Sequence, residues 1–384
     1  MARGSIFRRH GGYAIRVDLG PDPATGKRRQ HYKQGFRTKR EAEAALDELL
    51  SGVRSGDVVS QTSTTLGQFL DDWLASQNQR LKETTWNSYL VAVERIRNGL
   101  GKRKLQALTP LEIERFYLHL AESGGRTGRP LAAKTIRNTH VVLRKALDDA
   151  ERLGLVQRNA AAVARPPVAH RTEQQTWSAD NLRAFFAHAA DDRLYPAYVL
   201  LATTGMRRGE ALGLRWADVD LGHGQLAVVN TLTTVNYRPI LSTPKTKRSR
   251  RVIYLDPATV DVLRRHQANQ QAERMAAGPD WYHEIDFVFR DELGRPLHPE
   301  WFTREFGRQA RAAQLPTIRL HDLRHTFATL ALKEGVHPKI VSERLGHATV
   351  GITLDLYSHV TPAIAREAAD TVGSLIFGLR PAGP

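Results

Sequence analysis

The chain has 384 residues, more than one hydrophobic core usually organises, so two or three domains are expected. A net charge of +16 favours an anionic polymer or membrane surface as partner over a small metabolite. A hydrophobic content of 41% excludes wholesale disorder, and the absence of cysteine excludes disulfides, thiolate metal sites and a cysteine nucleophile. Because no apolar stretch is long enough to span a membrane and the first residues lack the apolar core of a secretory signal, a cytoplasmic protein is expected.

A small basic module is predicted at residues 1–60, whose first forty residues carry more than half of the net charge. Alternation of polar and apolar residues predicts a strand over 13–19, and turn residues lead to a second strand over 31–36, so that the two form a hairpin. A capping box predicts a helix over 38–52, and the Gly- and Ser-containing segment 51–64 is interpreted as a linker. We therefore predict a small sheet that carries one helix.

Residues 64–168 are predicted to form an all-α module. A capping box at Thr65 opens an amphipathic helix, and apolar residues at helical spacing predict further helices over 84–100, 109–124 and 134–154. The exposed basic residues expected on these helices favour contact with a nucleic acid.

The remaining residues, 172–384, are predicted to form a mixed, mainly helical domain. It follows a proline-containing linker over 164–175, which cannot continue a helix. β-Branched runs predict strands over 224–233 and 249–255, while most of the rest carries helical spacing.

Three side chains of the segment HDLRH, His321, Arg324 and His325, share one face of a predicted helix because their spacing is i, i+3, i+4. Such a cluster on a stable helix needs an anion, a metal ion or solvent. The HxxxH spacing suits a metal ion, but an arginine that points at the same site repels a dication, so no metal site is assigned.

The segment TGMRRGE places Arg207 and Arg208 after a glycine turn, at the start of a helix where one arginine can point inward and its neighbour cannot. A guanidinium stays charged at any relevant pH and binds two phosphate oxygens at once. Arg207 and Arg324, which come from separate segments, are therefore a candidate clamp for a pentavalent phosphorus. Glu210, one turn after Arg207, is the candidate partner that holds this guanidinium in place.

The motifs from TGMRRGE to DLYSHV, in this order and at these separations, resemble the tyrosine recombinases, the integrase family of phages and integrative elements. The family pattern is an Arg after TG[LM], a Lys on a β-hairpin, HxxRH, LGH, and a Tyr shortly after that last His. These positions are filled here by Arg207, Lys245, His321, Arg324, His347 and Tyr357. Lys247 is the alternative to Lys245 as the hairpin lysine, and alignment with the family favours Lys245.

The resemblance implies three domains: an α+β domain at residues 1–60 of the three-stranded arm-site DNA-binding type, an all-α core-binding domain at 64–168, and a mixed, mainly helical catalytic domain with a carboxy-terminal tail at 172–384. It implies a site-specific recombinase that cleaves and rejoins attachment sites through a covalent 3′-phosphotyrosine, for integration or excision of a mobile element. The implied partners are double-stranded DNA, further protomers in a homotetramer on DNA, an excision factor and a host DNA-bending protein. No cofactor and no metal are implied, and the expected location is the nucleoid within the cytoplasm.

Tyr357 is the implied nucleophile. A free tyrosine titrates near pH ~10, so its phenol needs proton removal and positive neighbours. His321, Arg207 and Arg324 are the candidates that supply them.

The family likeness assigns protonation of the departing 5′ oxygen to Lys245, whose pKa falls when it is desolvated among arginines. His347 would donate a hydrogen bond to a nonbridging phosphate oxygen. His325 is a supporting candidate, for which a structural role is an equal alternative.

Basic residues of the first two domains are candidates for binding the DNA backbone. They are Arg8, Arg9, Arg16, Lys27, Arg28, Arg29, Lys82, Arg95, Lys102, Lys104, Arg137 and Arg144. Arg137 and Arg144 lie on a predicted helix that is a candidate for the major groove.

Three other functions are compatible with parts of this pattern. A DNA-binding regulator without catalysis is disfavoured because all six family positions are filled, and a type IB topoisomerase because two DNA-binding modules precede the catalytic domain. A histidine–metal hydrolase would require a chelator-sensitive activity. The apolar tail residues Leu375, Ile376 and Phe377 fit packing on the same protomer or docking on a neighbouring one.

Overall fold

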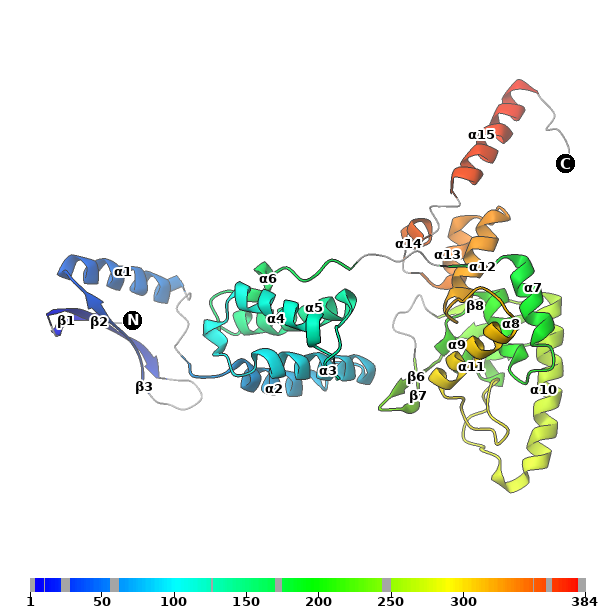
Figure 1. Cartoon of the computed structure of the whole chain (residues 1–384), viewed down its shortest axis with the longest axis horizontal. Coiled ribbons are helices and arrows are strands. Elements are labelled where there is room, and N and C mark those ends of the chain that lie inside the picture. The colour runs from blue at the N-terminus through cyan, green and yellow to red at the C-terminus, as the bar shows by residue number, and fades with distance from the viewer. Residues whose placement is uncertain are drawn as a thin grey trace. The chain divides into compact units, whose positions relative to one another are not determined.

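The computed structural model describes residues 4–9, 11–21, 28–55, 62–125, 127–169, 175–243, 250–347, 349–356 and 361–378. The chain forms two compact units, Met1–Arg171 and Thr172–Pro384, whose helices and strands are shown in Figure 1. Among the described helices, none is both long and apolar enough to cross a membrane.

The first unit begins with an antiparallel sheet in the order β1-β2-β3 that carries helix α1 (Figure 1). These elements are β1 (Gly4–Arg9), β2 (Gly12–Pro21), β3 (Arg28–Phe36) and α1 (Lys39–Ser55). Ile15 and Val17 of β2 are buried, and α1 packs against this strand. The predicted hairpin and helix are confirmed. Only the family resemblance indicated β1, because its sequence, GSIFRR, ends in two arginines and does not show a clear alternation of polar and apolar residues.

Helix α1 begins with the predicted capping box. The backbone N–H of Glu41 donates to Thr38 Oγ1 at 3.2 Å, and the N–H of Thr38 donates to Glu41 Oε2 at 3.4 Å. The helix continues to Ser55, so the prediction that a linker begins at residue 51 is wrong. A glycine inside a helix costs only about 1 kcal/mol, which good helix formers on either side offset.

The rest of the first unit is a helical bundle, as predicted. Its helices are α2 (Leu66–Gln77), α3 (Glu83–Leu100), α4 (Pro110–Ser123), α5 (Ala133–Arg152) and the short α6 (Ala160–Val163), which was not predicted. The capping box of α2 is present, because Thr65 Oγ1 accepts from Gln68 N and Gln68 Oε1 accepts from Thr65 N. Helix α3 packs against α2 and α5, and Trp73 Nε1 joins α2 to α5 by donating to Asp149 Oδ2 at 2.9 Å.

The second unit is mainly helical. Its helices are α7 (Ala179–His188), α8 (Tyr195–Thr204), α9 (Arg208–Leu212), α10 (Pro257–Ala277), α11 (Pro299–Ala312), α12 (Asp322–Lys333), α13 (Pro338–Leu345), α14 (Val350–Leu356) and α15 (Thr361–Phe377). Its strands are β4 (Val219–Asp220), β5 (Gln225–Val228), β6 (Thr231–Val235), β7 (Arg238–Ser242) and β8 (Arg251–Tyr254).

The strands of the second unit form a sheet in the order β4-β5-β8 and a separate hairpin, β6-β7. The predicted strand 224–233 is therefore divided between two sheets, while the strand predicted at 249–255 is confirmed as β8. Strand β7 was not predicted because Arg238 and Pro239 are poor strand formers. The two residues that join β6 to β7, Asn236 and Tyr237, both have positive φ, 48° and 61°, as a tight hairpin turn requires.

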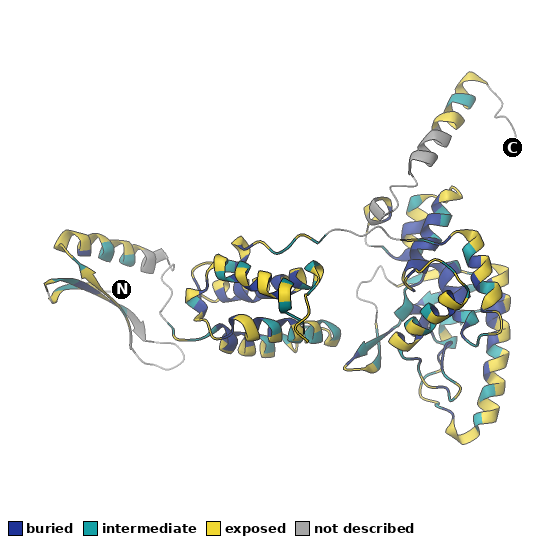
Figure 2. Ribbon diagram, viewed as in Figure 1, coloured by how far each residue is buried: buried dark blue, intermediate teal, exposed yellow. Residues whose placement is uncertain are grey.

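An aromatic core fixes the helices that lead to the site. Trp177, Phe185 and Phe306 lie within 5.6 Å of one another, centroid to centroid. Tyr198 of α8 stacks on Phe302 of α11 at 5.5 Å. Figure 2 shows this interior in dark blue, with exposed residues on the outer faces of the helices. Helix α8 is buried along most of its length, so its carboxyl end is held firmly inside the unit.

Candidate active site

The guanidinium of Arg324 lies between the carboxyl ends of two helices. Nη1 donates to the carbonyl of Gly205, which ends α8, at 2.9 Å, and Nη2 donates to the carbonyl of Leu345, the last residue of α13, at 2.7 Å. Only 3% of Arg324 is exposed. The last carbonyls of a helix have no partner inside the helix and carry partial negative charge, so they stabilise this buried cation.

Arg207 approaches the same end of α13 from a different segment. It is the N-cap of α9, where its backbone N–H and Nη1 donate to the two oxygens of Glu210 at 2.9 and 2.8 Å. Its Nη2 donates to the carbonyl of Gly346 at 3.3 Å. The side chain is 39% exposed, so it combines fixed geometry with access from solvent. Arg207 and Arg324 thus converge, because they bind the carbonyls of consecutive residues.

Arg251, the first residue of β8, is a third arginine at this site and was not predicted from the sequence. Its Nη2 and Nη1 donate to the two oxygens of Glu210 at 2.8 and 3.2 Å, and its Nε donates to the carbonyl of Arg344 at 2.6 Å. We call the backbone carbonyls of Arg344, Leu345 and Gly346 the carbonyl row, since they accept from Arg251, Arg324 and Arg207 in turn. In the sequence Arg251 is one of several basic residues in KRSRR, and nothing there distinguishes it.

Glu210 is buried between the guanidiniums of Arg207 and Arg251. Burial alone would raise its pKa, but the hydrogen bond and charge of Arg251 and the charge of Arg207 outweigh that effect and lower the pKa. The carboxylate is therefore ionised at neutral pH. The expectation that Glu210 holds Arg207 agrees with this geometry.

Three histidines surround the clamp. His321 is the N-cap of α12 and stays accessible to solvent, and its ring meets the ring of His325 edge-on, with centroids 5.2 Å apart. His347 lies just after the carbonyl row, and its Nδ1 is 2.8 Å from Thr353 Oγ1 on α14. Thr353 was not foreseen, because a threonine on a helix gives no distinctive signal.

Burial and the surrounding cations keep these histidines neutral. Burial together with the charges of Arg324 and Arg207 lowers the pKa of His347 to about 4, and burial with the neighbouring His321 lowers the pKa of His325 to about 4. Partial burial of its ring and the charge of Arg324 lower the pKa of His321 as well. At pH 7 each ring therefore has one nitrogen that can accept a proton.

We expect the second unit to lose stability as the pH falls from 6.5 toward 4. In the folded protein His325 and His347 resist protonation down to about pH 4, whereas in the unfolded chain they bind protons near pH 6.5, so acid favours the unfolded chain across this window. Urea unfolding of the whole chain at stepped pH measures the effect. A double variant, His325→Asn with His347→Asn, should show a shallower pH dependence, and an unchanged slope would contradict the assignment.

Arg208 also turns into the protein, so the expectation that only one of the two consecutive arginines points inward is wrong. Its Nη1 donates to Thr303 Oγ1 at 2.7 Å and to the carbonyl of Pro299 at 3.1 Å, both on α11. Neighbouring residues at the start of a helix leave the backbone in different directions, and each arginine here finds its own acceptors.

Gly346 has a geometric reason to be glycine. Its φ is +66°, and a Cβ there would lie 3.1 Å from Nη1 and 3.3 Å from Cδ of Arg251. We expect Gly346→Ala to lose stability by about 1–2 kcal/mol from the left-handed backbone alone. The new methyl group should also displace Arg251, and we therefore expect a lower rate of strand cleavage.

Gly335 provides the matched control, since its φ is +75° and a Cβ there would meet nothing within 4 Å. Gly335→Ala should lose about as much stability as Gly346→Ala, measured as the thermal midpoint. It should keep the wild-type rate of strand cleavage. Equal cleavage in both variants would show that the contact with Arg251 does not matter.

Three residues of the predicted site, Lys245, Lys247 and Tyr357, lie outside the described residues, and so does Lys27. Tyr357 directly follows the last residue of α14 in the sequence. Within the described part of the chain, no group of three or more His, Asp or Glu side chains is placed to hold a metal ion.

The candidate DNA-binding residues lie mainly on exposed surface of the first unit. Arg8, Arg9, Arg16, Lys82, Lys102, Lys104, Arg137 and Arg144 are exposed, and Arg95 is half-buried. Arg28 and Arg29 belong to β3, and their side chains are not described. Arg16 lies over the ring of Phe7 at 5.8 Å, and Arg9 Nη1 donates to the hydroxyl of Tyr32 at 3.2 Å.

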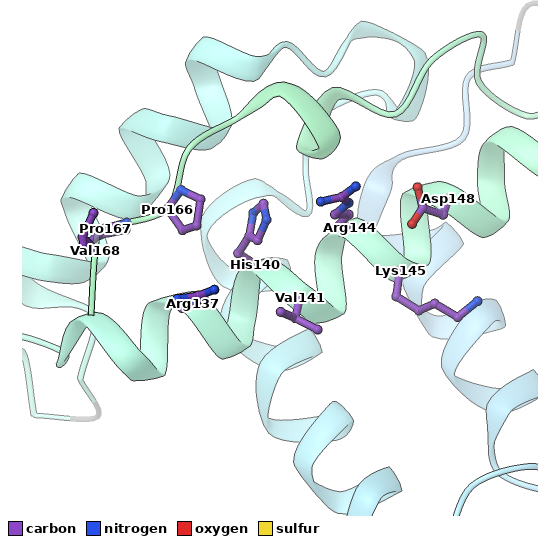
Figure 3. Close-up of a pocket in the computed structure, with 9 residues that line it drawn as sticks. All are labelled: Arg137, His140, Val141, Arg144, Lys145, Asp148, Pro166, Pro167 and Val168. Carbon is purple, nitrogen blue, oxygen red and sulfur yellow. The ribbon is translucent and has the colours of Figure 1, made fainter. Parts of the chain in front are cut away.

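A basic hollow lies along α5. Figure 3 shows side chains of this helix beside the segment 166–168, around a cavity of about 490 Å³. Arg137, Arg144 and Lys145 line it together with one acid, Asp148. The excess of cations suits an anionic ligand.

The sequence matches three protein-family profiles in chain order. Residues 6–52 match an Arm DNA-binding domain, residues 65–121 match the N-terminal SAM-like domain of phage integrases, and residues 176–363 match the Phage integrase family. The chain belongs to the phage integrase family of tyrosine recombinases. It is accordingly an enzyme of the class that cleaves and exchanges DNA strands.

Two relatives are similar over almost their whole length. A "Tyrosine recombinase XerC-like" protein of Caldanaerobacter subterraneus subsp. tengcongensis is 29% identical, with 95% of this chain and 96% of the relative covered. The ICEBs1 integrase of Bacillus subtilis is 27% identical, with 96% and 98% covered.

Solved integrase structures share the fold. The integrase of transposon Tn1549 in complex with a circular intermediate DNA has a TM-score of 0.69 at 21% identity, covering 81% of this chain and 100% of that one. A lambda integrase tetramer bound to a Holliday junction has a TM-score of 0.56 at 22% identity, covering 90% and 95%. The predicted fold class, an α+β first domain, a helical second domain and a mainly helical catalytic domain, is confirmed.

Proposed function

We propose that this protein is a site-specific DNA recombinase that integrates and excises a mobile element by cutting and rejoining attachment sites. The observation that carries the proposal is the convergence of Arg207 and Arg324 on consecutive carbonyls of the carbonyl row. Two guanidiniums that meet at neighbouring carbonyls suit the nonbridging oxygens of one phosphodiester. Similarity to the integrase of transposon Tn1549 and to the ICEBs1 integrase supports the mobile-element role.

In the proposed reaction the Tyr357 oxygen attacks the scissile phosphorus, forming a 3′-phosphotyrosine bond and breaking the bond to the 5′ oxygen. His321, neutral at pH 7, takes the phenolic proton, and Lys245 gives a proton to the departing 5′ oxygen. Arg207 and Arg324 stabilise the charge on the pentavalent phosphorus. The freed 5′ hydroxyl of a partner duplex then attacks the phosphotyrosine and regenerates Tyr357.

Two further residues support this reaction in the proposal. His347 donates a hydrogen bond to a nonbridging oxygen, held in place by Thr353 on α14. His325 packs against the ring of His321 and keeps it oriented.

The division of labour among domains is also proposed. Residues 1–60 would bind arm sites, 64–168 core sites, and 172–384 would carry out strand transfer. The hollow of α5 lined by Arg137 and Arg144 suits backbone phosphates. Because recombination joins four strands, the working form would be a homotetramer on paired DNA at the nucleoid, assisted by an excision factor and a host DNA-bending protein.

A covalent-adduct assay tests the proposal. The target is first identified by sequencing the DNA that crosslinks to the protein, and a nicked duplex of that sequence is then incubated with the wild-type chain. A protein–DNA adduct that survives denaturation is the expected result. Binding without an adduct would instead support a DNA-binding regulator, and relaxation of supercoiled DNA that lacks the target would support a topoisomerase.

A further inference from the structure

Two arginines share one buried carboxylate at the candidate active site. Glu210 is 4% exposed, and both of its oxygens accept from Arg251 while one also accepts from the side chain of Arg207. Arg251 is itself buried, with 8% of its side chain exposed, whereas the side chain of Arg207 is 39% exposed. The backbone N–H of Arg207 donates to Glu210 as well, so the buried carboxylate is shared by two arginines, of which Arg251 is the more buried.

The net charge of this group depends on Arg251. With both arginines and Glu210 ionised, the three side chains carry one excess positive charge, located on the more exposed Arg207. Without Arg251, Glu210 would be paired with Arg207 alone, and the pair would be neutral. Because Glu210 and the side chain of Arg251 are buried, the loss of that charge matters more than it would between exposed groups.

Arg251 also fixes where the neighbouring groups lie. Its Nε donates to the carbonyl of Arg344 at 2.6 Å, one residue before the carbonyl that binds Arg324 and two before the carbonyl that binds Arg207. The side chain lies against Gly346 as well, where an added methyl group would be 3.1 Å from its Nη1. One residue thus joins β8 to α9 and to the end of α13.

We propose that Arg251 is a positioning residue for strand cleavage: it neutralises Glu210 and anchors the carbonyl row, so that the positive charge of Arg207 remains available to the scissile phosphate. The inference rests on the proposed recombinase function. In this proposal Arg251 acts through Arg207 rather than by contact with the phosphate.

Substitution of Arg251 by methionine keeps much of the side-chain volume and removes the charge. Arg251→Met is expected to lower the single-turnover rate of adduct formation at saturating DNA by about 10- to 100-fold, less than direct loss of an oxyanion donor. The dissociation constant for the same DNA should change little, because Arg251 is buried away from it.

A second substitution distinguishes positioning from simple scaffolding. In the background of Arg251→Met, Glu210→Gln removes the competing negative charge while its amide oxygen can still accept from the N–H of Arg207. The double variant should cleave faster than Arg251→Met alone. If Arg251 only supports the fold, removal of a second buried group should slow cleavage further, and that result would overturn the inference.

A substrate change supplies an independent readout. In a duplex with a methylphosphonate at the scissile position, one charged nonbridging oxygen is replaced by a neutral methyl group, so the charge of the clamp matters less. The difference in rate between wild type and Arg251→Met should shrink on this substrate. A difference that stays the same would mean that Arg251 does not act through phosphate charge.

The pair of Arg193 and Glu273 is the matched control in the same unit. Arg193 donates to both oxygens of Glu273 at 2.6 and 2.7 Å, an ion pair that joins the segment before α8 to α10. Arg193→Met should lower the thermal midpoint and leave the adduct rate near that of wild type. A wild-type chain that forms no adduct would overturn the proposed function and this inference together, whereas a wild-type adduct with an unchanged Arg251→Met rate would overturn the inference alone.

Discussion

Tyr357→Phe is expected to abolish the covalent adduct, lowering its rate of formation by a factor of at least about 10⁴. The substitution removes one oxygen and leaves the ring, so it removes the group that attacks phosphorus while retaining the shape of the side chain. Affinity for the attachment site should stay within about twofold, because binding comes mainly from cations along the DNA backbone. Adduct formation on a nicked duplex and a gel shift with the same duplex measure the two quantities.

The exposed Tyr237 at the turn between β6 and β7 gives a control for the loss of a hydroxyl. Tyr237→Phe should form the adduct at the wild-type rate. An adduct that persists in Tyr357→Phe would show that another group is the nucleophile, and peptide mapping of the DNA-linked residue would identify it.

Arg324→Ala is expected to lower the rate of adduct formation by about 10²- to 10³-fold, since it removes donors aimed at the developing phosphorane charge. It should also destabilise the second unit by about 1–3 kcal/mol, because the carbonyls of Gly205 and Leu345 lose a buried partner. Single-turnover cleavage and urea unfolding measure the two effects. Arg324→Lys keeps the positive charge but lacks the planar guanidinium with its paired N–H donors. Compared with Arg324→Ala, it should therefore recover more of the stability than of the cleavage rate.

The exposed Arg308, which pairs with Glu305 on α11, serves as the control arginine of the same unit. Arg308→Ala should change neither the rate of adduct formation nor the free energy of unfolding by much, since ion pairs at the surface contribute little to stability. If Arg324→Ala unfolded the chain entirely, the lysine variant would still separate the contribution of charge from that of geometry. Full cleavage by a folded Arg324→Ala variant would remove Arg324 from the clamp.

Local signals in the sequence predicted much of the fold. Capping boxes at Thr38 and Thr65 and the proline at Pro110 marked helix starts correctly, because caps depend on a few neighbouring residues. Strand boundaries were harder, since pairing partners decide them. The β-branched run predicted as one strand over 224–233 is divided between two sheets, and β7 was not predicted because it contains Pro239.

Residues that carry motifs can be nominated for the site from the sequence, whereas contacts made by the backbone leave no signal in it. Arg207 and Arg324 could be paired from the phosphate-binding chemistry of guanidiniums on separate segments, and Glu210 from its place one helical turn after Arg207. Arg251 was missed because its role depends on β8 reaching the end of α13, a contact between distant segments. The carbonyl row is equally invisible in a sequence, because every residue has a carbonyl and only the fold decides which ones meet a cation.

The carbonyl row has a mechanical consequence. Consecutive Cα atoms are held about 3.8 Å apart by covalent geometry, so acceptors on adjacent residues cannot drift away from one another. Each arginine is also bound elsewhere, since Arg324 donates to Gly205 at the end of α8 while Arg207 and Arg251 donate to Glu210 of α9. A shift of α13 relative to α8 and α9 would therefore stretch several of these hydrogen bonds at once, so the end of α13 has to keep its place for the arginines to stay together.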